Sequence, residues 1–188
     1  MKTGVVELII KASEGEQDSI QTLFEQVYNE LKSMAHRIKF NWRNAHTLNT
    51  TALVHESYLK ILSNKELTPL NKLHFYRLCG RAMRYVLHDY LEKRQAQKRK
   101  GDFTEIGDHI QIPVVEARNN LENLEGVLIG LKKLEAEDTV MSQVVECRFF
   151  SDMTIEETAT VIGVSPATVK RKWNFARAYL SRSIKKIA

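Results

Sequence analysis

The sequence is poor in residues that interrupt helices. Among its 188 residues there are only eight glycines and three prolines. A sheet-rich fold needs many tight turns, which these residues supply, so their scarcity disfavours such a fold and fits a helical one. We therefore predict an all-α protein.

Cysteines and long apolar runs are also scarce. Cys79 and Cys147 are the only two cysteines, and each stands alone within a helical pattern. This predicts small buried thiols in a reducing cytoplasm rather than a disulfide. No apolar run approaches the length of a membrane span, and the first residues lack a signal-peptide pattern. We expect a cytoplasmic protein without a membrane partner.

Motifs for catalysis or metal binding are missing as well. The sequence has no phosphate-binding glycine loop, no G-x-S-x-G elbow and no H-E-x-x-H pair. Its six histidines occur singly, and neither His55-Glu56 nor His88-Asp89 has a second histidine one helical turn away. We predict no enzyme activity, no metal and no cofactor.

What the sequence does have is concentrated positive charge. The net charge of +5 favours a polyanionic partner, and the distribution of charge is more informative than the total. Residues 165–188 include seven Lys or Arg and no acidic residue, whereas residues 135–164 include seven acidic residues and one basic residue, Arg148. The cations thus lie on one C-terminal helix.

The clearest local signal is a helix-turn-helix between Thr154 and Leu180. Thr154-Ile155-Glu156-Glu157 forms a capping box at a helix start. Gly163 stands where that helix must end in a left-handed residue, and Ser165-Pro166 supplies the N-cap and first position of the next helix. The second helix of such a motif enters a DNA major groove.

This second helix has an apolar and a polar side. Val169, Trp173, Ala176 and Leu180 recur at helical spacing and should pack inward. A solvated basic face is the alternative to a DNA reader. We favour DNA, because the capped turn, the Ser-Pro restart and the charge contrast occur together. The candidate DNA-binding residues are Ser165, Thr168, Lys170, Arg171, Lys172, Phe175 and Arg177.

The N-terminal half predicts further helices. Apolar residues repeat at steps of three and four from Ile20 to Ile38, helices are expected over 51–62 and roughly 73–94, and residues 63–72 form a loop. Residues 65–100 include ten basic and three acidic residues. Arginines beside aromatic rings suit single-stranded or melted nucleic acid, although solvated charge competes for any one of them.

The composition reverses after Lys100. Residues 101–126 include six acidic residues and one basic residue. We predict an N-terminal domain over 1–100, a flexible acidic linker over 101–123, and a C-terminal helix-turn-helix domain over 124–188. The linker should be extended through Pro113, and helix from Glu116 onward stays an open alternative.

Two parts of the sequence resemble one protein family. TALVHESYLKIL (51–62) and HFYRLCGRAMRYVLHDYLEKRQAQKR (74–99) resemble region two of bacterial RNA polymerase sigma factors of the extracytoplasmic-function (ECF) group. VVECRFFSDMTIEETATVIGVSPATVKRKWNFARAYL (144–180) is similar to region four. Many members have Gln before the Glu of the third helix, where this chain has His55. Helix-turn-helix regulators share only the second half of the match.

The resemblance implies an all-α fold of two small helical domains and a function in promoter-specific initiation. Its implied partners are promoter DNA and core RNA polymerase, contacted at the β′ clamp and the β flap. The residues implied in polymerase binding are Leu53, His55, Glu56, Leu59 and Lys60. Those implied in holding the melted −10 element are Asn64, Lys65, Asn71, Lys72, Arg77, Arg81, Arg84 and Tyr85.

In the same way, the C-terminal helix would read the −35 element as duplex. Arg171 and Lys172 would contact guanine edges or phosphates, and Thr168 and Phe175 would touch bases or thymine methyls. The backbone would be positioned by the remaining candidates, Ser165, Lys170 and Arg177.

Other readings stay open. A helix-turn-helix regulator that acts without core polymerase is the main alternative, and an RNA-binding or purely structural helical protein is a third. No heptad seam supports a dimer, so we expect a monomer when free. Many members of the group bind an anti-sigma factor, for which the sequence carries no mark. The acidic linker either threads toward the polymerase RNA channel or screens the basic faces.

Overall fold

The computed structural model describes residues 4–14, 16–41, 49–63, 71–100 and 114–185. Within these ranges the chain is helical and has no strand, which confirms the all-α prediction. The helices are α1 (Val5–Ser13), α2 (Gln17–Asn41), α3 (Thr50–Leu62), α4 (Lys72–Lys100), α5 (Val114–Glu137), α6 (Thr139–Val145), the π-helical turn η1 (Glu146–Phe150), α7 (Ile155–Ile162) and α8 (Pro166–Lys185). None of the described helices is long and apolar enough to cross a membrane.

The N-terminal helices form where capping residues and apolar stripes predict them. The apolar stripe of α2 is buried, with Leu23, Val27 and Ile38 fully inaccessible. The side chain of Asn49 caps α3 by accepting a hydrogen bond from the Thr51 amide at 2.9 Å. Asn71 caps α4 in the same way, since its side-chain oxygen accepts from the His74 amide at 2.8 Å.

The helix-turn-helix is present as predicted. The Thr154 amide donates to Glu157 Oε2 at 2.7 Å and the Glu157 amide donates to Thr154 Oγ1 at 3.1 Å, which completes the capping box. Gly163 ends α7 with a φ of 70°, a left-handed conformation that glycine adopts without steric cost. Ser165 Oγ then accepts from the Thr168 amide at 3.1 Å and starts α8.

Two boundaries differ from the prediction. α5 begins at Val114, directly after Pro113 in sequence, so the last ten residues of the predicted linker are helical and the open alternative of a helix there is correct. α4 extends to Lys100 instead of ending near Arg94. The rest of the predicted linker, 101–113, lies outside the described residues, and the division into two domains stays a prediction.

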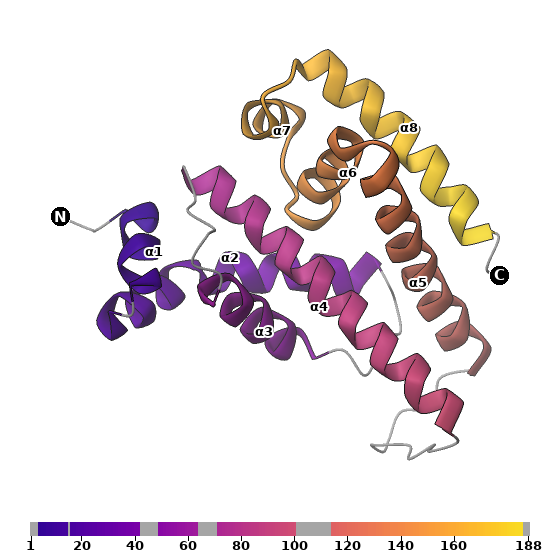
Figure 1. Ribbon diagram of the computed structural model, residues 1–188, viewed down its shortest axis with the longest axis horizontal. Helices are drawn as coiled ribbons and strands as arrows, with labels where there is room; N and C mark the ends of the chain where they lie inside the picture. Colours follow the sequence, from indigo (N-terminus) through magenta and orange to yellow (C-terminus); the bar gives the residue numbers. More distant parts are fainter. Residues whose placement is uncertain (1–3, 15, 42–48, 64–70, 101–113, 186–188) are drawn as a thin grey trace.

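The two groups of helices, α1–α4 and α5–α8, are packed against each other. α4 runs between them, with α1–α3 on one side and the C-terminal helices on the other (Figure 1). One apolar cluster is continuous across this interface and includes Phe75 and Met83 of α4 together with Phe150 of η1 and Leu131 of α5. Arg84, on the basic side of α4, therefore faces protein in this structure.

Candidate nucleic-acid and polymerase interfaces

The outward face of α8 is the most accessible of the predicted DNA-binding surfaces. Lys170, Arg171, Phe175 and Arg177 are all exposed, and the Phe175 side chain is 62% accessible. The predicted inward residues behave as expected, because Val169 and Ala176 are fully buried and Trp173 packs against both apolar clusters. An exposed aromatic ring among cations can contact base edges as well as phosphates.

Thr168 and Ser165 lie at the start of this face, where they bond to each other. Their hydroxyl oxygens are 2.9 Å apart, and the Ser165 hydroxyl also caps the helix. Ser165 is exposed and Thr168 is half-buried, so both belong to the α8 surface while fixing its first turn.

Lys172 differs from the other candidates because it already has a partner within the protein. Its ammonium group donates a hydrogen bond to Asp138, and this contact lowers the pKa of the Asp138 carboxyl. Asp138 also caps α6 by accepting from the Met141 amide at 2.9 Å. Lys172 therefore fastens α8 to the α5–α6 corner and is not available for a base contact in this conformation.

Trp173 supports the face from behind. Arg148 of η1 and Arg177 of α8 lie over its ring, 5.8 Å and 5.9 Å from the centroid. The Arg148 guanidinium also donates to the Met153 carbonyl. These contacts tie the turn before α7 to α8.

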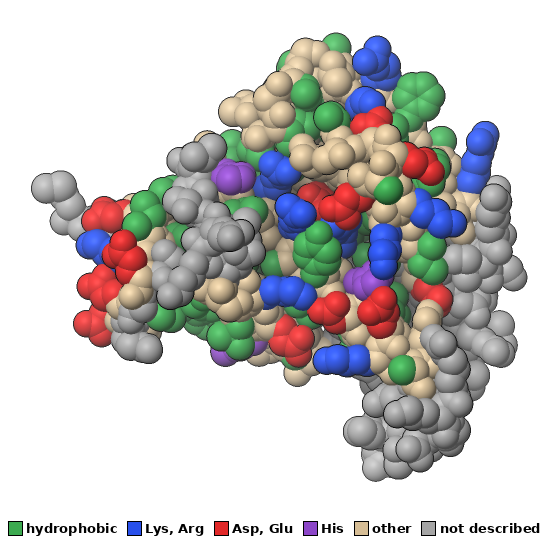
Figure 2. Space-filling model, in the orientation of Figure 1, with side chains coloured by type: hydrophobic (Ala, Val, Ile, Leu, Met, Phe, Trp, Pro, Cys, Tyr) green, Lys and Arg blue, Asp and Glu red, His purple; other side chains and the backbone are tan. Residues whose placement is uncertain are grey.

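The surface over α4 is mixed in charge where a single positive patch was expected. Figure 2 shows acidic side chains interleaved with the basic ones in the middle of the face on which the C-terminal helices meet α4. The carboxylates that pair with Arg84 of α4 come from α5 and η1. These carboxylates neutralise positive charge on the basic side of α4, which leaves less charge there for binding a polyanion.

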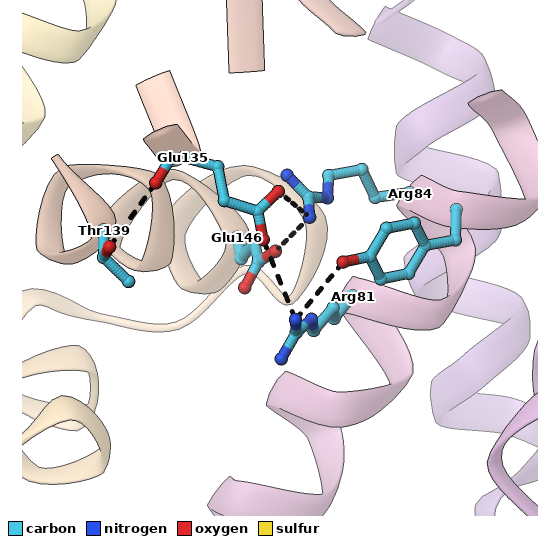
Figure 3. Close-up of polar contacts among 6 residues, drawn as sticks. Arg81, Arg84, Glu135, Thr139 and Glu146 are labelled. Carbon is cyan, nitrogen blue, oxygen red and sulfur yellow. Dashed lines mark hydrogen bonds and ion pairs between the residues drawn. The ribbon is translucent and has the colours of Figure 1, made fainter. Parts of the chain in front are cut away.

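Arg84 and Arg81 of α4 point at two glutamates from the other group of helices (Figure 3). Arg84 Nη2 lies 2.9 Å from Glu135 Oε2 and 3.1 Å from Glu146 Oε1. Arg81 Nη2 lies 3.7 Å from Glu135 Oε1 and 3.2 Å from the Tyr85 hydroxyl oxygen. Arg84 is only 4% exposed, so it has no surface to offer DNA in this conformation.

Glu146 is the most buried carboxylate of this contact. Its side chain is 3% exposed, and burial raises the pKa of the carboxyl even though Arg84, Arg81 and Arg77 pull it down. Neither Glu146 nor Glu135 was among the predicted site residues. The available signal was a pair of charged residues, Glu146 and Arg148, inside the apolar run VVECRFF, because a charge in such a run needs a buried partner.

The other predicted −10 residues are distributed around this contact. Tyr85 is half-buried, and its ring lies beneath Arg84 at 4.8 Å and Lys60 at 5.6 Å. Lys72 is exposed and lies over the Tyr76 ring at 5.7 Å, and Arg77 is half-buried. The side-chain oxygen of Asn71 caps α4 by accepting a hydrogen bond from the His74 amide. The last two predicted residues, Asn64 and Lys65, lie outside the described residues.

The predicted polymerase-binding side of α3 is accessible, with one correction. His55, Glu56, Leu59 and Lys60 are exposed, and Leu59 is 59% accessible. Lys60 is anchored to Asp89 of α4 at 2.8 Å. Leu53 does not belong to this surface, because its side chain is 2% exposed and lies in the core with Val54 and Ile61.

One group of metal-ligand types occurs among the described residues. His88, Asp89 and Glu92 have side-chain ligand atoms within 4.8 Å of one another. Asp89 is already paired with Lys60, and His88 Nδ1 lies 3.5 Å from Glu92. These contacts account for the group as part of the α3–α4 surface.

Comparison with known families decides between the readings that the geometry leaves open. The family model described as ECF sigma factor matches residues 2–186. The chain belongs to the ECF sigma factor family. No curated protein matches the chain. Sigma factors are DNA-binding proteins of transcription initiation, so the exposed cations of α8 and the arginines of α4 belong to a sigma factor and not to a helix-turn-helix protein of another kind.

Proposed function

We propose that this sigma factor binds core RNA polymerase and directs promoter-specific initiation by reading a −35 element and holding a melted −10 element. The observation that carries the proposal is the extent of the family match, which runs through both groups of helices over residues 2–186. A regulator that shared only the helix-turn-helix would match in its C-terminal part alone.

The −35 element is assigned to α8. Lys170, Arg171, Phe175 and Arg177 present three cations and an aromatic ring on one accessible face, with no acidic residue on the helix. Arg171 suits bidentate contact with a guanine, Phe175 suits a thymine methyl, and Lys170 and Arg177 suit phosphates. The start of the helix is fixed by Ser165 and Thr168, which positions these side chains.

Core polymerase is assigned to the accessible side of α3. Leu59 is a large apolar side chain that is 59% exposed between Glu56 and Lys60. An apolar residue within a charged rim is the usual composition of a protein-binding site. The partners that the family implies here are the β′ clamp for α3 and the β flap for the C-terminal helices.

The melted −10 strand is assigned to α4 and the segment before it. Arg77, Arg81 and Lys72 provide cations for phosphates, and Tyr85 provides a ring on which an unpaired base can stack. Trapping a base costs about a few kcal/mol of unstacking. The predicted loop residues Asn64 and Lys65 belong to the same assignment.

Run-off transcription with purified core polymerase on a promoter library tests the proposal. The sigma factor is expected to co-purify with core polymerase and to yield transcripts from a subset of templates that share −35 and −10 sequences. A chain that binds duplex DNA but neither associates with core polymerase nor supports transcripts would instead be a regulator acting without polymerase.

A further inference from the structure

We propose that Asn174 of α8 reads an adenine of the −35 element and that Arg177 holds its amide group in place for that contact. The inference deepens the proposed function, on which it rests, by naming a base and the side chain that recognises it. Asn174 is exposed and was not among the predicted site residues. Three features of this residue point to base recognition: its place on the helix, its chemistry and its contact with Arg177.

Asn174 lies on the outward side of α8, together with the residues assigned to bases. The inner side of the helix packs against α5, α6 and α7 (Figure 1). Four exposed residues follow one another on the outward face at the spacing i, i+3, i+4 and i+7, namely Arg171, Asn174, Phe175 and Ala178. The base-reading helix of homeodomains uses the same spacing in the major groove. Asn174 can therefore reach the groove that Arg171 and Phe175 enter.

The amide of Asn174 supplies a combination of groups that its basic neighbours lack. Adenine presents an acceptor, N7, and a donor, the N6 amino group, to the major groove. Lysine and arginine only donate hydrogen bonds, whereas an asparagine amide donates through Nδ2 and accepts through Oδ1. Asn174 is the single asparagine or glutamine in residues 165–188. No other amide side chain of this segment can make the bidentate contact that adenine favours.

Arg177 determines which way that amide faces. Nη2 of Arg177 lies 3.1 Å from Asn174 Oδ1 and donates a hydrogen bond to it. Because a guanidinium has no acceptor, the amide oxygen must face it and Nδ2 must point away. A carbonyl oxygen has two lone pairs, so Oδ1 can accept from Arg177 and from the adenine amino group together. The contact within the chain is therefore compatible with the contact to the base.

Arg177 is itself held by the packed side of α8. Its guanidinium lies 5.9 Å from the centroid of the Trp173 ring, and Trp173 packs against both apolar clusters. Contacts thus run from the interior through Arg177 to the amide of Asn174. Ordering a free side chain costs conformational entropy on binding, and this cost is smaller when the orientation is set beforehand. The remaining N–H groups of Arg177 stay available for a phosphate.

A change of base preference tests the assignment. Core polymerase with the full chain transcribes templates whose −35 region is randomised, and the transcribed templates are sequenced. The unmodified chain should enrich an adenine at one position of the −35 element. Asn174→Asp replaces the amide by a carboxylate, which only accepts hydrogen bonds. The preference at this position should therefore change from adenine to cytosine, which presents a donor to the major groove.

Two further variants complete the comparison. Asn174→Ala removes both groups of the amide, so the preference for adenine should fall about tenfold without moving to another base. Asn29→Asp makes the acidic change on an exposed asparagine of α2 and should leave every preference of the unmodified chain as it is. A preference for adenine that survives in both Asn174 variants would overturn the inference.

The positioning role of Arg177 is tested through the same preference, in titrations of selected and base-substituted duplexes. Arg177→Ala should weaken binding to every duplex and also lower the preference for adenine about threefold, because the amide is no longer held. Lys170→Ala removes a cation from the same helix and should weaken binding without changing that preference. Equal preferences in these two variants would show that Arg177 does not position the amide.

Failure of the inference can be distinguished from failure of the proposed function. The same −35 sequence selected by the unmodified chain and by Asn174→Asp would leave the proposed function standing and overturn the reading by Asn174. Transcribed templates of the unmodified chain that share no −35 sequence would overturn the proposed function, and the inference with it.

Discussion

Arg84 of α4 and Glu146 of η1 form an ion pair at 3.1 Å in which the side chains are only 5% and 3% exposed. The pair joins two groups of helices that the sequence predicts as separate domains. Since a buried charge is costly unless it is paired, each residue depends on the other group of helices for its partner. The arginines expected to face DNA and the carboxylates beside them are thus parts of one contact.

The two ends of this pair should respond differently to mutation. Arg84→Met leaves Glu146 charged and buried with only the more distant Arg81 and Arg77, which should cost about 3–5 kcal/mol. Glu146→Gln should cost less than about 1 kcal/mol, because the amide leaves no buried charge, its oxygen can still accept a hydrogen bond from Arg84, and Arg84 keeps Glu135 as a charged partner. Urea unfolding at neutral pH measures both changes. Equal losses for the two variants would contradict this account of the pair.

The same carboxyl should make stability depend on pH in a defined direction. Burial raises the pKa of Glu146 above its ordinary 4.5, so the folded chain holds this proton more strongly than the unfolded chain. Its contribution to stability is therefore fully present below pH 4.5 and is lost as the pH rises through the raised pKa. Urea unfolding across this window should show a decline that Glu146→Gln removes. The pKa of Asp138 is lowered, so its contribution to stability is constant above pH 3.8, is lost only as the pH falls below that value, and leaves the decline due to Glu146 unaffected.

The local part of this structure was predictable from the sequence because it depends on neighbouring residues. Thr154 and Glu157 form the predicted capping box, and Gly163 takes the left-handed conformation that ends α7. Capping and periodicity are properties of a few consecutive residues, so they can be recognised without knowing what the helix packs against. The exposed cations of α8 follow from the same pattern.

The contacts between distant helices were not predictable in this way. Leu53 is core and Lys172 is tied to Asp138, although each had been assigned to a binding surface. Periodicity gives the faces of one helix but not which neighbour covers them. The prediction that acidic residues screen the basic faces named the linker, whereas the carboxylates that do so here are Glu135 and Glu146. Glu135 and Glu146 both follow the predicted linker, 101–123, in the sequence.

Leu59 and Phe175 allow polymerase binding and DNA binding to be separated. Leu59→Asp puts a charge on the α3 surface and should weaken association with core polymerase at least tenfold, since a charge buried without a partner in an interface costs more than the roughly 1.4 kcal/mol that a tenfold change requires. Duplex binding should be unchanged. Phe175→Ala should weaken duplex binding and leave association with core polymerase unchanged. A pull-down with core polymerase measures the association, and a titration with duplex DNA measures the affinity for DNA. Loss of polymerase binding in Phe175→Ala alone would exchange the two assignments.

Arg171 and Lys170 are neighbours on α8, both exposed, and should differ in what they read. Arg171→Ala should cost about 1–3 kcal/mol at one base pair of a −35 duplex selected from the library, because a bidentate contact with guanine is lost. Lys170→Ala should weaken binding to all sequences and lower the salt slope by about 1, because a phosphate contact is lost. Titrations on selected and scrambled duplexes at several salt concentrations distinguish the two. Equal losses on both duplexes for both variants would show that the base-reading side of α8 is not the one assigned here.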